Sequence, residues 1–278
     1  MEFDCKTPAT VADSLTRTVC VKKTQQSVLN LTILGIFAGV YIGFGAQLAT
    51  FVTHDAAAFL GLGISKLIGG AVFSVGLMLV VIAGAELFTG NNLILLSVLD
   101  RQVKLRGLLR NWTIVYIANF AGALLLVLLM YWGGLWKTGG AAVGAAAVKL
   151  ADAKVSLSFL EALARGILCN WLVCLAVWMA VSARDVVGKI FAIFFPIMAF
   201  VAMGFEHSVA NMYFIPAGLF TKAFEAATTG ATQSALDALT MANTVRNIIW
   251  ATIGNIVGGG GFVALIYWAS YVKGSEQK

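Results

Sequence analysis

The chain has 278 residues, of which 60% are hydrophobic and only 12% are charged, and its formal net charge is +6. Soluble domains carry about 25% charged residues, so this composition excludes an ordinary soluble enzyme and indicates an integral membrane protein. The positive charge does not require a nucleic acid partner, because Lys and Arg in membrane proteins gather in cytoplasmic loops.

The first part of the chain, residues 1–26, is polar and mixed in charge, which argues against a cleavable signal peptide. Val11, Leu15 and Val19 recur at helical spacing and predict a short amphipathic segment on the cytoplasmic side. Such a helix lies on the membrane surface or caps a pore, and the surface position is favoured. The first membrane span is expected at about residues 29–52, where glycines recur at spacings that allow close helix contact.

The second apolar stretch, about residues 66–99, is too long for one straight membrane helix. Two glycines, Glu86, a hydroxyl and two amides interrupt it between residues 84 and 92. This pattern predicts a helix that breaks and restarts, which a membrane protein tolerates only where the backbone is buried in protein or lines a cavity.

The fifth stretch, about residues 190–220, is interrupted in the same way by Glu206, His207 and Asn211. Ionisable groups at membrane depth cost about 2.5 kcal/mol or more each, so they tend to face a cavity and carry function. The second half of the chain holds only this histidine. We therefore expect a polar site within the membrane that binds a solute and exchanges a proton. The alternative is a buried polar cluster that only holds the helices together.

The remaining elements complete a six-span plan. Further spans are predicted at about 111–132, 159–182 and 245–272, with a basic loop at 100–110, short surface helices in 133–158, a polar loop at 221–243 and a cytoplasmic tail at 273–278. Six spans place both termini on one side of the membrane. More Lys and Arg residues fall on that side, so both termini are expected in the cytoplasm.

The chain also repeats itself. Glu86 and Asn91 recur as Glu206 and Asn211 at an offset of 120, and three further matches share an offset of 136: Arg110-Asn111 with Arg246-Asn247, Asn119 with Asn255, and Tyr131-Trp132 with Tyr267-Trp268. Residues of about 27–134 and 159–272 therefore form two copies of one three-span unit within a transport domain at 27–272. An odd number of spans inverts the second copy, and inverted repeats with broken helices indicate a transport path between them.

This plan first suggests an aquaporin, but the chain has no Asn-Pro-Ala at either break. It instead resembles the formate/nitrite transporter family over about residues 27–272. The matching stretches are Gly84-Ala-Glu-Leu-Phe-Thr89, Arg110-Asn-Trp112, the run from Gly166 to Met179, Gly204-Phe-Glu-His-Ser-Val-Ala-Asn-Met212 and Gly254-Asn-Ile-Val-Gly258. The resemblance implies an all-α, aquaporin-like fold with six transmembrane helices in an inverted 3+3 repeat, of which helices 2 and 5 are broken. It also implies a homopentamer with one pore per subunit in the bacterial inner (plasma) membrane.

The resemblance assigns roles by position. His207 corresponds to the family's pore histidine, Thr89 to its hydrogen-bond partner, and Asn170 and Asn211 to neighbouring amides. The other implied sites are an outer constriction (Phe73, Phe200), an inner constriction (Leu77, Phe88, Val173) and a vestibule lysine (Lys154). From the residues alone, ordinary helix packing explains the apolar five and a solvated loop explains the lysine equally well. Glu86 and Glu206 are expected to bond backbone N–H groups of the restarted helices.

The implied function is passage of a small monovalent anion, formate or nitrite, moved with a proton through His207; hydrosulfide or another weak acid is the alternative. Apolar constrictions oppose a bare anion, whereas imidazole titrates near neutral pH. A competing mechanism keeps the anion charged and hydrogen-bonds it to Thr89, Asn170 and Asn211. We expect no enzymatic activity and no cofactor or metal. A haem-binding subunit would need paired intramembrane histidines, and only His207 qualifies. An intramembrane hydrolase is also disfavoured, because the chain contains no His-Glu-x-x-His or Gly-x-Ser-x-Gly motif.

Overall fold

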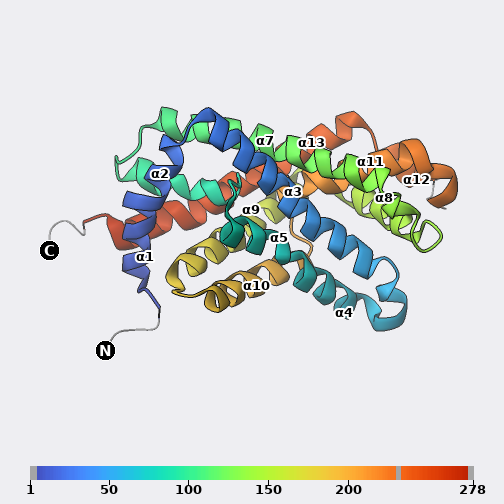
Figure 1. Ribbon diagram of the computed structural model, residues 1–278, viewed down its shortest axis with the longest axis horizontal. Helices are drawn as coiled ribbons and strands as arrows, with labels where there is room; N and C mark the ends of the chain where they lie inside the picture. Colours follow the sequence, from blue (N-terminus) through green and yellow to red (C-terminus); the bar gives the residue numbers. More distant parts are fainter. Residues whose placement is uncertain (1–4, 230–232, 275–278) are drawn as a thin grey trace.

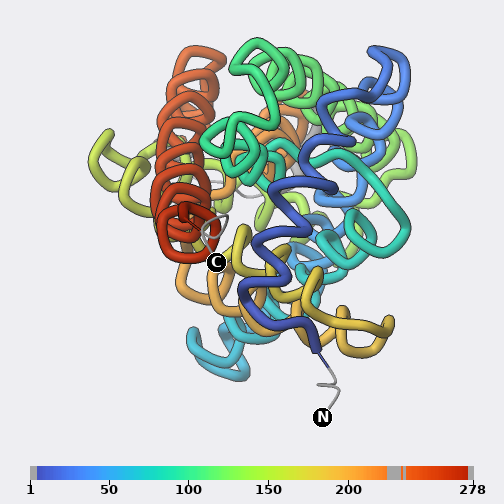
Figure 2. The backbone as a smooth tube through the Cα atoms, turned by 90° about the vertical axis from the view of Figure 1, so that its left-hand side faces the viewer, coloured from blue at the N-terminus to red at the C-terminus, as the bar shows by residue number. Residues whose placement is uncertain are grey.

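The computed structural model describes residues 5–229 and 233–274 of the chain. These residues form helices that run mostly along the long axis of the molecule, with one isolated bridge between Cys5 and Ala183 (Figure 1). Seen along that axis, the helices surround one another in a single bundle (Figure 2). Residues 1–4 of the predicted N-terminal segment, 230–232 of the predicted loop and 275–278 of the predicted tail lie outside the described residues.

The helices in the first half of the chain are α1 (Pro8–Ser14), η1 (Leu15–Val19), α2 (Cys20–Gln25), α3 (Val28–Thr53), α4 (Ala56–Phe73), α5 (Val75–Met78), η2 (Leu79–Gly84), η3 (Gly90–Leu93), α6 (Ile94–Leu99), α7 (Leu105–Trp132) and η4 (Leu135–Lys137). Those in the second half are α8 (Ala142–Val155), α9 (Phe159–Ser182), α10 (Val186–Ala202), α11 (Ser208–Thr229), α12 (Gln233–Ala238), α13 (Met241–Ile256), η5 (Val257–Leu265) and η6 (Trp268–Val272).

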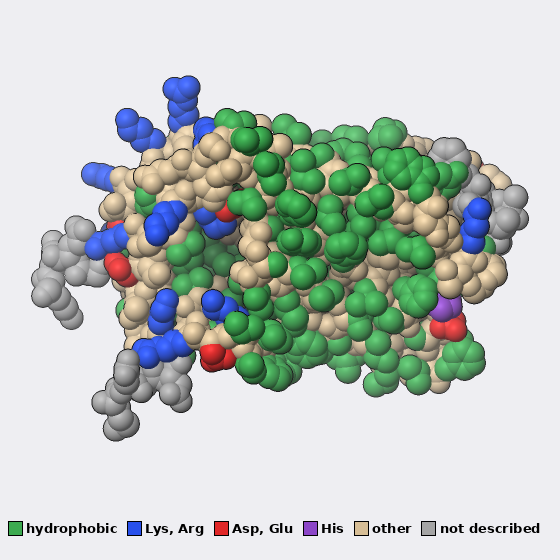
Figure 3. All heavy atoms as spheres, in the orientation of Figure 1, with side chains coloured by type: hydrophobic (Ala, Val, Ile, Leu, Met, Phe, Trp, Pro, Cys, Tyr) green, Lys and Arg blue, Asp and Glu red, His purple; other side chains and the backbone are tan. Residues whose placement is uncertain are grey.

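Five helices of the described chain are long and apolar enough to cross a membrane: Val28–Thr53, Ala56–Gly84, Leu105–Trp132, Phe159–Ser182 and Met241–Val272. Two shorter apolar helices, Gly90–Leu99 and Val186–Ala202, accompany them. Figure 3 shows hydrophobic side chains covering the middle of the molecule and Lys and Arg gathered mainly at one end. An apolar belt between polar ends is what a bilayer requires, so the molecule is a multi-pass membrane protein.

Both predicted interruptions are present in the backbone. The second long apolar helix ends at Gly84, which has a φ of +94°, and the chain is extended at Ala85 before helix resumes at Gly90. In the second half α10 ends at Ala202, Gly204 has a φ of +74°, and α11 begins at Ser208. Glycine suits these positions because it adopts positive φ without a Cβ clash.

The N-terminal helices pack on the protein itself. Val11, Leu15 and Cys20 are almost fully buried, and α1, η1 and α2 contact η6, α6 and α7. The favoured surface position is therefore wrong for this segment, because its apolar face is matched by the ends of other helices. This contact places the segment at one end of the bundle.

Several element boundaries differ from the expected ones. Helix α4 starts about ten residues earlier than the predicted second stretch and kinks at Gly61, where φ is +75°. The helix α7 starts at Leu105, so the predicted basic loop is shorter. The segment at 133–158 contains the 14-residue α8, whose buried face includes Val143 and Ala147 and contacts α11, so it is not a loose surface helix. Most of the predicted loop at 221–243 is helical.

Glycines allow the long helices to approach within backbone contact. A Cβ on Gly39 would lie 2.0 Å from the carbonyl oxygen of Asn119, which couples α3 to α7. A Cβ on Gly258 would lie 2.2 Å from the carbonyl oxygen of Ile167, which couples η5 to α9 in the same manner. Small residues at such crossings let membrane helices pack closely. Each half of the chain therefore contains one tightly packed pair of long helices, α3 with α7 and α9 with η5.

Candidate functional site

His207 lies at the second helix break, immediately before α11, and its side chain is buried. Its Nδ1 accepts a hydrogen bond from the backbone N–H of Ala210 at 3.0 Å, and its Nε2 lies 2.9 Å from Thr89 Oγ1 at the first break. Since Nδ1 acts as an acceptor, the neutral ring carries its proton on Nε2 and donates it to Thr89. One histidine and one threonine, 118 positions apart, thus join the two breaks.

A cavity of about 240 Å³ opens on one side of His207; we name it the Lys154 cavity. Phe200 stacks on the imidazole with ring centroids 5.9 Å apart, and Phe73 meets Phe200 edge-on at 5.8 Å. Three cationic side chains and one carboxylate also line this cavity: Lys66, Lys154, Arg165 and Glu206. The surplus of positive charge favours an anion at the mouth, while the aromatic rings exclude water nearer the histidine.

Lys154 forms the principal ion pair of that cavity. Its Nζ lies 2.9 Å from Glu206 Oε1, and only 14% of the lysine side chain is exposed. The lysine is therefore not a solvated loop residue. Lys154 stands in the last turn of α8, and the buried face of this helix packs on α11. This packing positions the lysine at the cavity.

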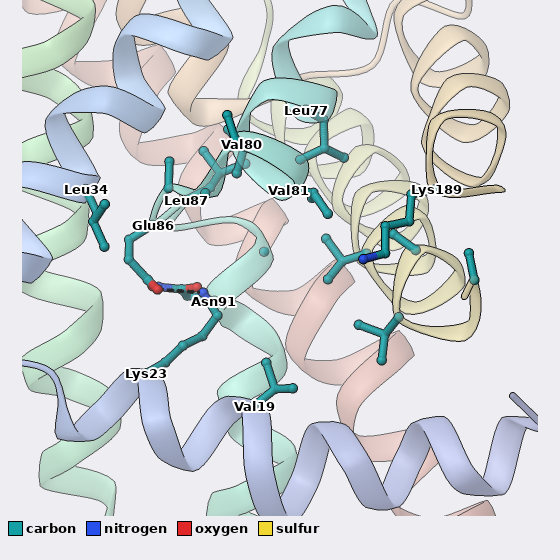
Figure 4. A pocket seen from close by; sticks show the side chains of 18 of the residues that line it. Val19, Lys23, Leu34, Leu77, Val80, Val81, Glu86, Leu87, Asn91 and Lys189 are labelled. Atoms are coloured by element: carbon teal, nitrogen blue, oxygen red, sulfur yellow. Dashed lines mark hydrogen bonds and ion pairs between the residues drawn. The ribbon is translucent and has the colours of Figure 1, made fainter. Parts of the chain in front are cut away.

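A larger cavity of about 650 Å³ lies at the end of the molecule covered by the N-terminal helices; we name it the Lys23 cavity. Lys23 Nζ lies 2.8 Å from Glu86 Oε1, and Figure 4 shows Lys23 and Asn91 meeting at this carboxylate while Lys189 extends into the cavity from another helix. With Lys6, this cavity also holds three cations and one carboxylate.

Sequence reasoning missed Lys23 as a site residue. The repeat contained a usable signal, because each half carries a polar helical segment with a lysine that precedes a Glu at a helix break. The family resemblance indicated Lys154 in the second half. The corresponding lysine in the first half, in the polar helical segment that precedes Glu86, is Lys23.

Both carboxylates contact side chains, which corrects the expectation that they bond backbone N–H groups. Glu86 Oε2 accepts from Asn91 Nδ2 at 2.7 Å, and Glu206 Oε2 accepts from Asn211 Nδ2 at 2.6 Å. The other oxygen of each carboxylate faces its lysine. A buried carboxylate is stabilised more by a cation and an amide than by a backbone dipole alone.

The asparagines extend this arrangement to the long helices. In the first half Asn91 bonds Asn111 Oδ1, and Asn111 Nδ2 bonds the Lys23 carbonyl. The second half repeats both contacts with Asn211, Asn247 and the Lys154 carbonyl. Each lysine is thereby fixed through its backbone and its side chain.

A second pair of asparagines satisfies the interrupted backbones. Asn119 Oδ1 accepts from the N–H of Phe88, and its Nδ2 donates to the carbonyls of Gly35 and Glu86. Asn255 makes the corresponding bonds to the N–H of Ser208 and the carbonyls of Gly166 and Glu206. Buried backbone groups need such partners, so these amides make the two breaks tolerable inside a membrane.

The predicted polar residues lie in one connected region. Asn170 Nδ2 lies within bonding distance of the Thr89 carbonyl, Asn92 Oδ1 and the Asn255 carbonyl. The Oδ1 atoms of Asn170 and Asn211 are buried and accept no hydrogen bond from the described part of the chain. The Asn170 amide therefore lies beside Thr89 and the His207 donor, whereas the Asn211 side chain lies with Glu206 and Asn247.

The apolar residues divide between different surroundings. Phe73 and Phe200 line the Lys154 cavity, and Leu77 lines the Lys23 cavity. Val173 is buried in the core, and Phe88 packs edge-on against Trp112 and Tyr116 of α7, with centroids 5.8 and 4.8 Å apart. The grouping of Leu77, Phe88 and Val173 as one constriction stays a prediction.

The structure offers little to a metal ion. Among residues 5–229 and 233–274, no three His, Cys, Asp or Glu side chains come together at one point. The charged groups instead line two cavities, of which the Lys154 cavity reaches His207. A bundle of apolar helices that contains charged cavities is typical of a membrane channel or transporter.

Comparison with known proteins identifies the family to which this membrane protein belongs. The profile described as formate/nitrite transporter matches residues 10–269. The chain is 42% identical over 283 residues to a probable formate transporter of Methanothermobacter thermautotrophicus, covering 96% of this chain and 98% of that one. It is 38% identical over 279 residues to formate channel FocA of Escherichia coli K12, covering 99% and 97%. The chain belongs to the formate/nitrite transporter family.

Solved structures agree with this assignment. A pentameric formate channel with formate bound superposes with a TM-score of 0.80 at 39% identity, covering 88% of this chain and 98% of that chain. An ion channel of the same family superposes with a TM-score of 0.79 at 30% identity, covering 95% and 98%. The helical arrangement described above is thus that of the family.

Proposed function

We propose that this protein moves formate across the membrane together with a proton and that His207 is the group at which the proton is exchanged. The observation that carries the proposal is the buried His207–Thr89 bond beside the Lys154 cavity, which holds three cations. The relatives described as formate channels or transporters support formate as the solute.

The electrostatics of the site favour a neutral species at its centre. Lys154 and its neighbouring cations concentrate anions in the cavity. Beyond them, Phe73 and Phe200 lie against the imidazole, and removing water from a bare anion there is costly. Formic acid avoids that cost, and its O–H suits acceptor oxygens such as Asn170 Oδ1 and Asn211 Oδ1.

The hydrogen bonds of His207 support one order of proton steps. The resting ring holds one proton, on Nε2, because Nδ1 accepts from the Ala210 N–H. The ring takes up a proton from the aqueous cavity at Nδ1, which breaks the bond to Ala210, and then gives its Nε2 proton to formate. Formic acid results, together with a neutral ring that carries its proton on Nδ1. Loss of that proton to water and uptake of another at Nε2 restore the resting tautomer, and the acid releases its proton to water on the far side.

The architecture implied by the sequence completes this proposal. The matched contacts around Glu86 and Glu206 support an inverted repeat of three spans each, with six crossings in an aquaporin-like arrangement. The relative described as pentameric supports a homopentamer with one path per subunit. The excess of Lys and Arg supports cytoplasmic termini in a bacterial inner membrane, with the Lys23 cavity facing the cytoplasm.

The experiment measures formate uptake by proteoliposomes over a series of pH values. His207→Phe removes the exchanging ring, and we expect it to abolish the pH dependence of uptake. His54→Phe is the matched control, because that histidine lies at the end of α3 and bonds the Phe51 carbonyl. An unchanged pH response in His207→Phe would exclude the proton-exchange role and favour the charged-anion mechanism at Thr89, Asn170 and Asn211.

The same liposomes identify the solute. Nitrite, hydrosulfide and lactate are compared with formate at each pH, and formate is expected to give the fastest uptake. Faster uptake of nitrite or hydrosulfide would replace formate in the proposal without changing the proton step.

A further inference from the structure

Phe214 on α11 also lines the Lys154 cavity, together with Phe73, Phe200 and Phe205. It stacks against Phe73 with ring centroids 6.4 Å apart and an interplanar angle of 18°. Phe73 meets Phe200, and Phe200 stacks on His207. The three rings therefore form a continuous aromatic wall that ends at the imidazole.

The other end of this wall is Lys154. Its Nζ lies 5.2 Å from the centroid of the Phe214 ring and 2.9 Å from Glu206 Oε1. A cation within about 6 Å of an aromatic face is attracted to it, and the attraction strengthens where water is excluded. The ammonium is thus held between a carboxylate on one side and a ring on the other.

The Lys23 cavity has the carboxylate without the ring. The position equivalent to Phe214 is Ile94, and the apolar side chains that line this cavity among the described residues are aliphatic, such as Leu77 and Val80. Lys23 is also more exposed than Lys154, at 25% against 14% of the side chain. The aromatic contact is therefore specific to the smaller cavity.

We propose that Phe214 is a positioning and specificity-determining residue for the transport described above. Its ring fixes the Lys154 ammonium at the mouth of the cavity, and its bulk narrows the space in front of Phe73 so that small acids are favoured over larger ones. This inference rests on the proposed function and adds a residue to which the sequence analysis assigned no role.

The two parts of the inference predict different kinetic effects. Loss of the ring alone weakens the hold on Lys154, so the concentration of formate that gives half-maximal uptake rises while maximal uptake is unchanged. Loss of bulk enlarges a cavity of only about 240 Å³, so lactate gains relative to formate. A residue that serves only to pack the helices would change neither quantity selectively.

The test uses the full chain in proteoliposomes with three substitutions at one position. Phe214→Tyr keeps the ring and is expected to behave as the unmodified protein. Phe214→Leu keeps an apolar side chain without the ring and is expected to raise the half-saturating formate concentration about threefold, the size of a modest cation–π contact. Phe214→Ala is expected to show the same rise and also a higher ratio of lactate to formate uptake.

Phe220→Leu provides the control for general packing, because Phe220 lies further along α11 and its ring meets Tyr131. A normal half-saturating concentration in Phe214→Leu overturns the positioning role, and a normal lactate ratio in Phe214→Ala overturns the size selection. Equal effects in Phe220→Leu and Phe214→Leu overturn both, because they show a packing effect. Absence of formate uptake by the unmodified protein instead rejects the proposed function, before any variant is compared.

Discussion

The two helix breaks share their supporting contacts and differ in the residues between them. Glu86 and Glu206 each pair with a lysine and an asparagine at closely similar distances. Yet the position of His207 in the second break is occupied by Leu87 in the first, and that of Thr89 is occupied by Val209 in the second. The scaffold is present twice, whereas the histidine–threonine bond is present once.

This difference separates the requirements of the fold from those of the proposed chemistry. A helix interrupted inside a membrane needs its backbone groups satisfied and its carboxylate paired, and both halves meet that need in the same way. The proposed proton exchange needs one titratable ring. A second histidine at position 87 would add the cost of another polar group inside the membrane. Substitutions in the shared contacts should therefore affect stability in both halves, and those in the unique pair should affect transport.

The largest effect is expected from the asparagines that bridge the breaks. Asn119→Leu leaves the Phe88 N–H and the carbonyls of Gly35 and Glu86 without their partner. Each buried unsatisfied group costs about 1–3 kcal/mol, so we expect a loss of at least about 3 kcal/mol in the free energy of unfolding. Asn255→Leu should be equally harmful, and thermal unfolding in detergent measures both. A harmless substitution in either half would show that the two scaffolds are not equivalent.

The next effect distinguishes the two lysines. Lys154→Met leaves Glu206 buried without its cation, at a cost of about 3 kcal/mol. Lys23→Met should cost less, because Lys23 is more exposed and Gln26 Nε2 also donates to Glu86. Thermal unfolding compares the two variants, and adding Glu206→Gln to Lys154→Met should recover part of the loss. Equal losses at the two positions would contradict the difference in burial.

A smaller effect is expected where the halves differ. Thr89→Val removes the oxygen that His207 Nε2 bonds and makes the first break resemble the second at this position. Loss of one hydrogen bond of about 1 kcal/mol corresponds to roughly a fivefold slower proton-coupled uptake with little change in stability. Uptake is followed with a pH-sensitive dye inside the liposomes, and Thr221→Val serves as the control because that buried hydroxyl bonds a carbonyl within its own helix and lines neither cavity.

The smallest effect concerns the N-terminal helices that close the Lys23 cavity. Burial raises the pKa of the Cys20 thiol to about 12 from an ordinary value of 9.0. The reactive thiolate is therefore scarce below pH 9, and stability should fall only as the pH rises from 9 towards 12. At pH 8 a maleimide should label the exposed Cys5 and not Cys20. Rapid labelling of Cys20 in the native protein would show that the helix detaches from the bundle.

The sequence pattern was informative wherever local chemistry determines structure. Glycines beside a carboxylate in an apolar run predicted both breaks, since only glycine takes up a φ of +94° or +74° there without strain. The repeated asparagines indicated equivalent positions, and the structure places Asn119 and Asn255 in equivalent contacts. The interrupted apolar run indicated His207, the family resemblance added Thr89, and the structure brings the two to 2.9 Å.

The rest depended on contacts between distant segments. Whether the apolar face of residues 8–25 meets lipid or protein cannot be read from its periodicity, because either partner buries the same side chains. The partners of Glu86 were missed for the same reason, since Lys23 is 63 positions away. Phe214 stands in an apolar run with no local feature to distinguish it, and only its distance to Lys154 reveals a role.

A hydrogen bond between Tyr116 and Thr252 connects α7 to α13. Tyr116, whose ring packs on Phe88, places its hydroxyl 2.8 Å from Thr252 Oγ1, and the two positions are 136 apart, the same interval that relates the matched motifs. This bond therefore joins the two halves of the chain. Because the same tyrosine ring packs on Phe88, movement of α13 would be transmitted to the first break through a single side chain.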